Sequence, residues 1–299
     1  MRSVATGNRQ KRWDMSWLTN CYLRARTKFC NDFMSRAHNA MRSPMSTPLQ
    51  GKTVLVTRPA EQAGELTRCL AGAGADVIVL PTLEIEPLQL DPAQRSLIME
   101  LDRYDFVICV SANAAALGLS ALADYWPQWP VQQRWMAVGP ATGEEMRRWQ
   151  VNPKVAQQGA TSETLLDWSE LQQLVDRRVL ILRGEGGRET LAQTLQQRGA
   201  KVEYLELYRR VLPDVDARPL QRRLIQGETV ILTVTSGDGL RNLMTLMGAQ
   251  QTLLLHNPLI VISGRLAQFA TGLGFKHVIQ SASPALRDVI NSIEQLQAD

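Results

Sequence analysis

The chain repeats itself at a nearly constant shift of 125 residues, and each matched pair has the pattern of a strand followed by a helix start. VLVTR at Val54–Arg58 is echoed by VLILR at Val179–Arg183, and FVICVSAN at Phe106–Asn113 by ILTVTSGD at Ile231–Asp238. At the same shift Ser111 falls on Ser236. One shift held over several motifs indicates an internal duplication, and its period is an ordinary domain size.

Short apolar segments rich in β-branched residues alternate with helical patterns along the chain. The predicted strands are 53–57, 76–80, 106–110, 135–138, 179–182, 202–206, 230–234 and 259–262. Three predicted helices stop at glycines, namely Gly74, Gly199 and Gly274. This alternation predicts right-handed crossovers and parallel sheets with helices on both faces. The predicted fold class is therefore α/β, with two similar lobes.

Two segments fit neither a helix nor a buried strand, Leu83–Leu88 (LEIEPL) and Leu207–Pro213 (LYRRVLP). Both alternate polar and apolar residues, as does a ribbon that is exposed to water on both sides. We interpret them as linkers that can pair with one another.

The positive net charge of the chain belongs to its beginning. Residues 1–48 hold nine Lys or Arg against two acidic residues, so this stretch is +7, and the remaining residues are −3 because the whole chain is +4. The predicted folded part therefore lacks the basic composition of a nucleic-acid-binding protein. We expect residues 1–48 to be a disordered extension, or an artefact of a start codon upstream of the true one at Met45. The alternative is a membrane-surface helix or a transit-like peptide.

Cysteine and histidine usage argues against disulfides, zinc and nucleophilic catalysis. The four cysteines are scattered and form no CxxC pair. His38, His256 and His277 have no suitable partner nearby in the sequence. No apolar stretch has the length of a membrane helix and no secretory signal is present, so we expect a cytoplasmic protein without membrane contact.

Several turns after predicted strands could hold an anion. In a doubly wound sheet the ligand lies beyond the carboxyl ends of the strands, where helix N-termini present unpaired N–H groups. The alternative is that small polar residues there only cap helices. The candidate turns are Thr57–Arg58, Ser111–Asn113, Val138–Thr142, Thr161–Ser162, Arg183–Gly184, Thr235–Gly237 and Ser263–Arg265.

RGEGGR at Arg183–Arg188 resembles a glycine-rich phosphate loop but lacks the full G-x-G-x-x-G spacing. It is a weak dinucleotide signal.

Tyr208 stands out because it lies in a predicted linker between Leu207 and two arginines. A phenol is protonated at neutral pH and can donate a proton to a departing oxygen; the alternative is a packing tyrosine.

The motifs together resemble the uroporphyrinogen-III synthase (HemD) family over residues 51–299. The most specific block is VLILRGEGGRETLAQTLQQRGAKVEYLELYRR at Val179–Arg210. The others are VLVTRP at 54–59, VSANA at 110–114, AVGPAT at 137–142, ATSETLL at 160–166 and VTSGDGL at 234–240.

The resemblance implies two α/β lobes joined by a two-stranded β ladder. Residues 51–83 and 213–299 would form one lobe, 89–205 the other, and 83–88 with 207–212 the ladder. It also implies a cofactor-independent and metal-independent cyclising lyase. Hydroxymethylbilane, a linear tetrapyrrole with carboxylates on every ring, would lose its terminal hydroxyl, and the last ring would be inverted through a spiro intermediate to give uroporphyrinogen III.

By the same resemblance Tyr208 would donate a proton to the leaving hydroxyl. The resemblance also implies eight substrate contacts, namely Arg58, Ser111, Asn113, Gly139, Thr142, Ser162, Arg183 and Ser236. We expect a monomer with no nucleic-acid or membrane partner and a transient contact with the upstream hydroxymethylbilane synthase. Two alternatives stay open: a non-catalytic two-lobed binder of an anionic metabolite, and a nucleotide-dependent oxidoreductase or transferase that uses the RGEGGR turn.

Overall fold

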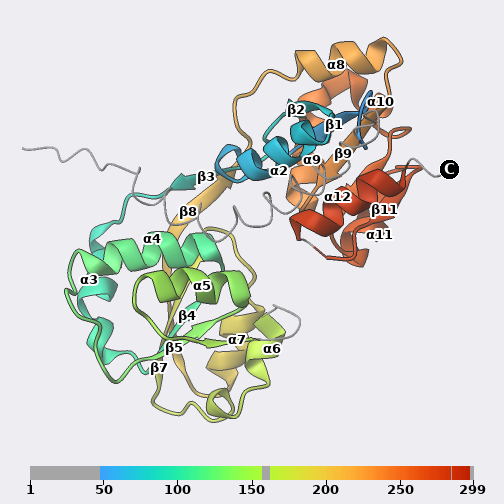
Figure 1. Ribbon diagram of the computed structural model, residues 1–299. Helices are drawn as coiled ribbons and strands as arrows, with labels where there is room; N and C mark the ends of the chain where they lie inside the picture. The colour runs from blue at the N-terminus through green and yellow to red at the C-terminus, as the bar shows by residue number, and fades with distance from the viewer. Residues whose placement is uncertain (1–47, 157–161, 284, 297–299) are drawn as a thin grey trace, which may run out of the picture. The chain divides into compact units, whose positions relative to one another are not determined.

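The computed structural model describes residues 48–156, 162–283 and 285–296. They divide into two units (Figure 1). Unit 1 combines the chain up to Thr82 with the chain from Val215 onward, and unit 2 is Leu83–Asp214. The chain therefore passes from one unit to the other twice.

Unit 1 contains a parallel five-stranded sheet. Its order is β11 (Val278–Gln280), β10 (Leu259–Val261), β9 (Val230–Val234), β1 (Thr53–Val56) and β2 (Asp76–Val79). Helices α2 (Ala60–Gly72) and α12 (Leu286–Gln295) pack on one face. The other face carries α8 (Arg218–Ile225), α9 (Gly237–Met247), α10 (Gln251–Leu254) and α11 (Gly264–Gly272), and η4 (Gly248–Gln250) connects α9 to α10.

Strand β1 shows why the unit needs both parts of the chain. Val54 and Val56 pack with α2 and α12, whereas Leu55 packs with α8 and α9 on the opposite face. Its neighbour β9 lies far along the chain, with Thr53 paired to Val230. Strands that are covered on both faces are apolar throughout, so neither part of unit 1 could bury its strands alone.

Unit 2 contains a six-stranded mixed sheet. Its order is β3 (Glu84–Pro87), β8 (Lys201–Val211), β7 (Arg178–Gly184), β4 (Phe106–Cys109), β5 (Arg134–Ala137) and β6 (Lys154–Val155). One face carries α3 (Pro92–Met99), η2 (Leu101–Arg103), α4 (Ala112–Ala123) and α5 (Pro140–Arg148). The other carries α6 (Ser162–Leu166), η3 (Ser169–Leu171) and α7 (Thr190–Gln197).

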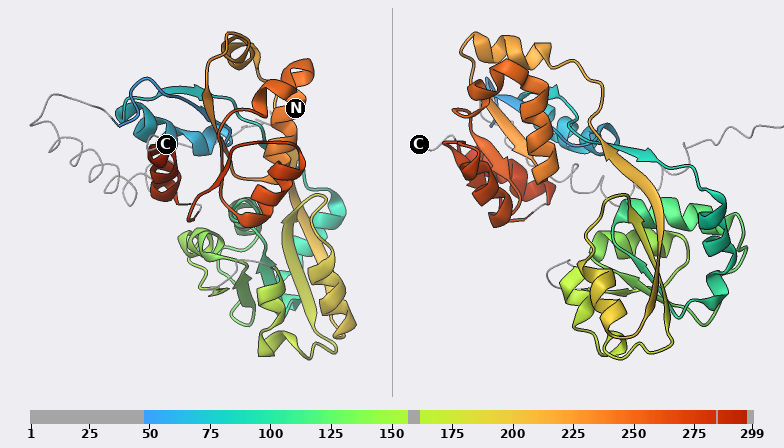
Figure 2. Two further views of the ribbon diagram at one scale, coloured as in Figure 1. Left: turned by 90° about the vertical axis from the view of Figure 1, so that its right-hand side faces the viewer. Right: turned by 180° about the vertical axis from the view of Figure 1, so that it is seen from behind.

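The predicted α/β class is confirmed, with two corrections in unit 2. The predicted strand 202–206 continues through 207–211 of the predicted linker in one eleven-residue strand, β8, which Figure 2 shows as a long continuous arrow. The segment around Glu84–Pro87 pairs with it antiparallel, as the predicted ladder requires, but this pair belongs to the sheet of unit 2, which is therefore mixed and not purely parallel. Alternation alone did not predict this continuity, because β8 changes its pairing partner at Tyr208, from β7 before this residue to β3 after it.

Gly199 ends α7 with a backbone φ of 94°, and its repeat equivalent Gly74 ends α2 with a φ of 93°. Both values lie in the left-handed region that glycine adopts without steric cost. A Cβ at Gly199 would also lie 3.1 Å from Val175 Cα. The matched conformations explain why the repeat preserves glycine at these helix ends.

We expect Gly199→Ala to lower the free energy of unfolding by roughly 1–3 kcal/mol, because alanine is strained at this φ. Urea unfolding measures this. The control is Gly64→Ala inside α2, where a Cβ meets nothing within 4 Å and helix propensity predicts a gain of about 1 kcal/mol. An unchanged or raised stability in Gly199→Ala would contradict the strain argument.

Candidate functional site

The carboxyl ends of the parallel strands of unit 2 bring three turns to one edge of the sheet. Ser111 follows β4, Gly139 follows β5, and Gly184 ends β7. Ser111 is the N-cap of α4, and its Oγ accepts a hydrogen bond of 3.0 Å from Ala114 N–H. The predicted meeting of these turns at one edge follows from the parallel pairing.

A β-bulge brings Tyr208 to the same edge. Strand β8 runs parallel to β7 in regular register up to the pair Arg183 and Glu206, and then Gly184 pairs with Tyr208. Regular alternation would place Tyr208 on the face of Tyr204. The extra residue instead turns it to the face of Leu205 and Leu207, which pack with α4.

The Tyr208 ring packs directly on Gly184. A Cβ at Gly184 would lie 2.5 Å from Tyr208 Cε2 and 2.6 Å from Cζ, so only glycine leaves room for this ring. Glu185 N–H donates a 2.7 Å hydrogen bond to the Tyr208 carbonyl. Backbone and ring position are therefore both fixed by the turn that follows β7.

The phenol hydroxyl of Tyr208 has two polar neighbours. It lies 3.0 Å from Ser111 Oγ, and Arg210 Nη2 donates to it at 3.3 Å. Tyr208 is only 1% exposed, whereas Ser111 is half-buried and Arg210 is exposed. The expectation of a ribbon exposed on both sides was therefore wrong at Tyr208, because the bulge turns its ring into the core.

Arg183 has protein partners around its whole guanidinium. Nε donates to Glu206 at 3.0 Å, Nη1 donates to Glu189 at 2.8 Å, and the group lies 3.9 Å from the centre of the Tyr204 ring. Arg183 is 6% exposed. A substrate carboxylate would have to displace Glu189 or Glu206, so the geometry favours a structural role for Arg183 over the predicted binding role.

The side chains of Arg183, Tyr204 and Glu189 are strongly coupled electrostatically. Hydrogen bonds from Tyr204 and then from Arg183 lower the pKa of Glu189. Burial, followed by the hydrogen bond to Glu189, raises the pKa of Tyr204 to about 12. Glu189 is also the N-cap of α7. A carboxylate at the helix start next to the RGEGGR turn opposes a bound phosphate, which disfavours the nucleotide alternative.

The remaining candidates of unit 2 lie in the first turns of its helices. Asn113 is half-buried at the start of α4. Gly139 is the N-cap of α5, where Thr142 is 5% exposed. Ser162 is the first residue of α6, and its side chain lies outside the described residues. Asn113 and Gly139 thus lie beside the Ser111 turn, whereas buried Thr142 offers little surface to a ligand.

In unit 1, Arg58 and Ser236 follow the neighbouring strands β1 and β9. Ser236 is the N-cap of α9 and accepts a 3.0 Å hydrogen bond from Gly239 N–H, as Ser111 does for its own helix. Thr57 Oγ1 donates to Thr233 O at 2.6 Å and ties the two strand ends together. The repeat has therefore preserved a capping serine in both units.

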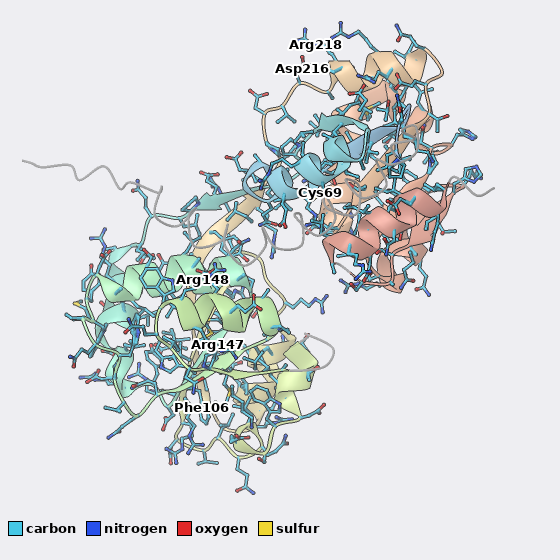
Figure 3. All side chains as sticks on the ribbon, in the orientation of Figure 1. Cys69, Phe106, Arg147, Arg148, Asp216 and Arg218 are labelled. Atoms are coloured by element: carbon cyan, nitrogen blue, oxygen red, sulfur yellow. The ribbon has the colours of Figure 1, made fainter. Side chains whose placement is uncertain are left out.

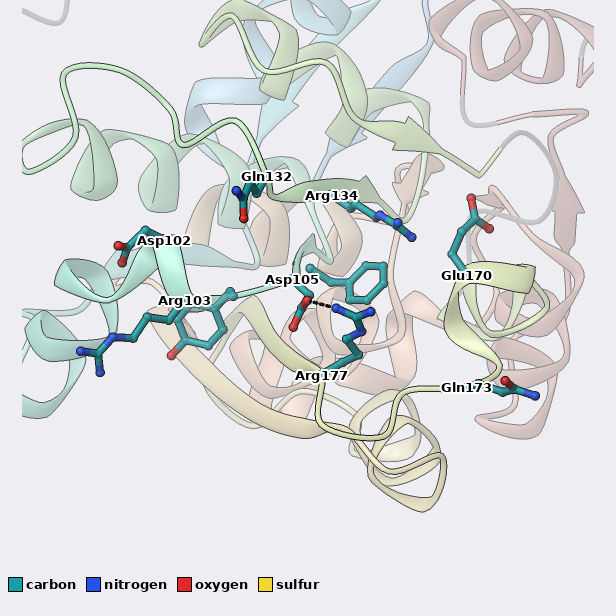
Figure 4. A pocket seen from close by; sticks show the side chains of 10 residues that line it. Asp102, Arg103, Asp105, Gln132, Arg134, Glu170, Gln173 and Arg177 are labelled. Atoms are coloured by element: carbon teal, nitrogen blue, oxygen red, sulfur yellow. Dashed lines mark hydrogen bonds and ion pairs between the residues drawn. The ribbon is translucent and has the colours of Figure 1, made fainter.

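A polar depression of about 400 Å³ lies at the opposite, amino-terminal edge of the unit 2 sheet (Figure 4). Phe106, Arg134 and Arg177 line it at the starts of β4, β5 and β7. Arg177 pairs with Asp105 at 2.6 Å across it. Acidic and basic side chains are mixed there, so it has no preference for a polyanion.

Two residues of the carboxyl edge were not among the predicted site residues. Gly184 and Arg210 both lie in the specific block, but their contacts with Tyr208 depend on the bulge and on strand pairing.

In the described part of the chain, no group of three or more His, Cys, Asp and Glu side chains could hold a metal. None of the described helices has the length and hydropathy to cross a bilayer.

Fold and site define a two-unit α/β protein with a tyrosine, a capping serine and an arginine at the carboxyl edge of one sheet. The family model described as "Uroporphyrinogen-III synthase HemD" matches residues 64–291. The chain belongs to this family, and it is a cyclising lyase of haem biosynthesis.

Curated relatives support the assignment. Uroporphyrinogen-III synthase of Escherichia coli K12 is 33% identical over 230 residues, which cover 76% of this chain and 93% of the relative. The Salmonella typhimurium enzyme is 31% identical with the same coverage. These values confirm the sequence resemblance.

Solved structures support the fold. A mutant uroporphyrinogen III synthase of Thermus thermophilus aligns with a TM-score of 0.60 at 17% identity, covering 83% of this chain and 100% of that one. The Helicobacter pylori enzyme aligns with a TM-score of 0.51, also at 17% identity, covering 82% and 99%.

Proposed function

We propose that Tyr208 is the acid of this lyase, which protonates the leaving hydroxyl of hydroxymethylbilane. The contact of the phenol with Ser111 Oγ at 3.0 Å carries the proposal. Tyr208 is a proton donor at the carboxyl edge, where ligands bind in sheets of this kind. Its covered ring is held by Gly184, which keeps the hydroxyl directed at the turn after β4.

The hydrogen bonds around the phenol suit proton donation. Arg210 donates to the Tyr208 oxygen, and Ser111 Oγ already accepts from Ala114 N–H with a second lone pair to spare. The phenol proton can thus point to Ser111. In the substrate complex the leaving hydroxyl would take the place of Ser111 as acceptor, reaching the phenol from the side of the half-buried serine.

In the proposed step the Tyr208 proton moves to the leaving hydroxyl, the C–O bond breaks, and water departs. This leaves an azafulvene cation beside a phenolate. The substituted carbon of the last ring attacks the azafulvene cation to form the spiro intermediate. This intermediate fragments and recloses with the last ring inverted. The phenolate regains a proton when the closing pyrrole carbon loses its hydrogen, so only water is lost overall.

Most of the catalytic task would be conformational. Spontaneous closure gives the symmetrical isomer I, so the protein must hold a conformer that disfavours direct end-to-end closure. Backbone N–H groups and hydroxyls at the turns of Ser111, Asn113 and Gly139 would hold substrate carboxylates. Monomeric state, contact with the upstream synthase and cytoplasmic location stay predictions.

The direct test supplies hydroxymethylbilane to the full chain and resolves isomers III and I by chromatography. Excess isomer III over the spontaneous reaction is expected. Isomer III formed no faster by the full chain than in the spontaneous reaction would contradict the proposed step.

Ser111→Ala is expected to lower kcat about fivefold, because one neutral hydrogen bond to the phenol is worth about 1 kcal/mol. It also removes a helix cap, at a cost of about 1 kcal/mol in stability. The matched control is Asp91→Ala, which removes the cap of α3 (Gln94 N–H to Asp91 Oδ1, 2.7 Å); Asp91 has no hydrogen bond to Tyr208 or Ser111, although Gln94 Nε2 donates to Glu206 O of β8. Equal kcat losses in both variants would assign the effect to stability alone.

A further inference from the structure

Two adjacent arginines of β8 have opposite environments. Arg209 forms a bidentate ion pair with Glu86 of β3, with Nε and Nη2 donating at 2.9 and 2.8 Å. Arg210 is exposed, donates to the Tyr208 hydroxyl at 3.3 Å and lies 5.5 Å from the centre of its ring. The charge of Arg209 is therefore paired within the β3–β8 ladder, whereas the charge of Arg210 lies beside the proposed acid.

Strand pairing explains this difference. In the antiparallel ladder Glu86 lies opposite Arg209, whereas apolar Ile85 lies opposite Arg210. Side chains alternate between the two faces of a strand, so Arg210 shares the face of Tyr208 and Arg209 does not. Arg210 consequently extends over the edge that carries Ser111.

Carboxylate partners are common among the arginines of this chain. Figure 3 labels Arg218 and Asp216 at the start of α8, which form such a pair at 2.8 Å, and Arg183 has two acidic partners. In contrast, no carboxylate of the described residues lies within ion-pair distance of Arg210. A permanently charged guanidinium with four further N–H donors is left available to an external anion.

We propose that Arg210 binds a carboxylate on the ring of hydroxymethylbilane that carries the leaving hydroxyl. This inference rests on the proposed role of Tyr208 and extends it. Guanidinium and carboxylate form two parallel hydrogen bonds, which fix orientation as well as distance. Anchoring that ring beside Arg210 places its hydroxymethyl group, only a few bonds from the carboxylate, at the phenol. Arg210 is thus a binding and orienting residue for the reacting ring.

The test compares Arg210→Gln, Arg210→Lys and Arg209→Gln. Arg210→Gln is expected to raise KM for hydroxymethylbilane at least about tenfold, which corresponds to the loss of about 1.4 kcal/mol of binding. Arg210→Lys keeps the charge without the planar fork and should fall between Arg210→Gln and the unmodified chain. Arg209→Gln is the matched control with unchanged KM and kcat, because its exposed ion pair is worth little.

A second measurement is independent of turnover. Fluorescence titration with uroporphyrin III, which carries the product's carboxylates, should show a Kd raised about tenfold in Arg210→Gln and unchanged in Arg209→Gln. The Kd of Arg210→Gln should also depend less on salt concentration than that of the unmodified chain. Urea unfolding of all three variants checks that each is folded.

Equal KM and Kd in Arg210→Gln and Arg209→Gln would overturn the inference. So would a loss of kcat with unchanged KM and Kd, because Arg210 would then act only on the phenol. If Tyr208→Phe kept a normal kcat, the proposed role of Tyr208 would fail instead, and the uroporphyrin titration would still decide whether Arg210 binds a carboxylate.

Discussion

Tyr208→Phe is expected to lower kcat for uroporphyrinogen III formation by roughly 100-fold or more, the range typical of a lost general acid. Phenylalanine keeps the ring between Gly184 and α4 and removes only the hydroxyl. Ser111 still accepts from Ala114 N–H, so stability should change by no more than about 1 kcal/mol. Initial-rate kinetics with isomer separation, together with urea unfolding, measures both quantities.

The comparison with serine variants makes this result specific. Ser111→Ala should lower kcat only about fivefold, since the serine orients the phenol and donates no proton to the substrate in the proposed step. Similar kcat values for Tyr208→Phe and Ser111→Ala would contradict the leaving-group role. A normal kcat in Tyr208→Phe would show that Tyr208 is a packing residue, the alternative that the sequence left open.

Gly184→Ala is expected to inactivate the enzyme nearly as strongly, although Gly184 has no side chain to take part in chemistry. The new Cβ would lie 2.5 Å from a ring carbon of Tyr208, closer than van der Waals contact allows, so the ring must shift and the hydroxyl should lose its 3.0 Å contact with Ser111 Oγ. Overpacking of this kind costs about 1–3 kcal/mol in stability. Steady-state kinetics and urea unfolding of the variant measure the two effects.

A double variant tests whether the effect passes through the ring. With Tyr208→Ala as background, the added Cβ at Gly184 no longer meets the ring carbons, so Gly184→Ala should then cost much less stability than it does alone. Gly64→Ala, which meets nothing within 4 Å, is the control for replacement of a glycine as such. Equal stability costs in both backgrounds would show that Gly184 acts independently of Tyr208.

Local patterns in the sequence were sufficient for the fold class and for part of the site. Ser111 and Ser236 cap helices after matched strands, as the repeat predicts, and the three glycines at helix ends all have positive φ. These features depend on hydrogen bonds and backbone conformations a few residues apart. The family resemblance identified the activity, which the comparisons confirm.

The burial of Tyr208 depends on tertiary structure. Alternation along β8 predicts that it shares a face with Tyr204, but the bulge opposite Gly184 moves it to the face of α4. A single inserted residue reverses every side chain beyond it, and its position depends on the partner strand.

By itself the sequence determined the α/β units, their duplicated caps and the chemical types of residue near the site, because these are set by local periodicity and backbone preference. Only the tertiary structure decided which charges are neutralised. Arg183 meets Glu189 and Glu206 across the turn after β7, whereas Arg210 lies opposite Ile85 and has no acidic partner among the described residues. Such pairings depend on strand register and burial, which join residues far apart in the chain.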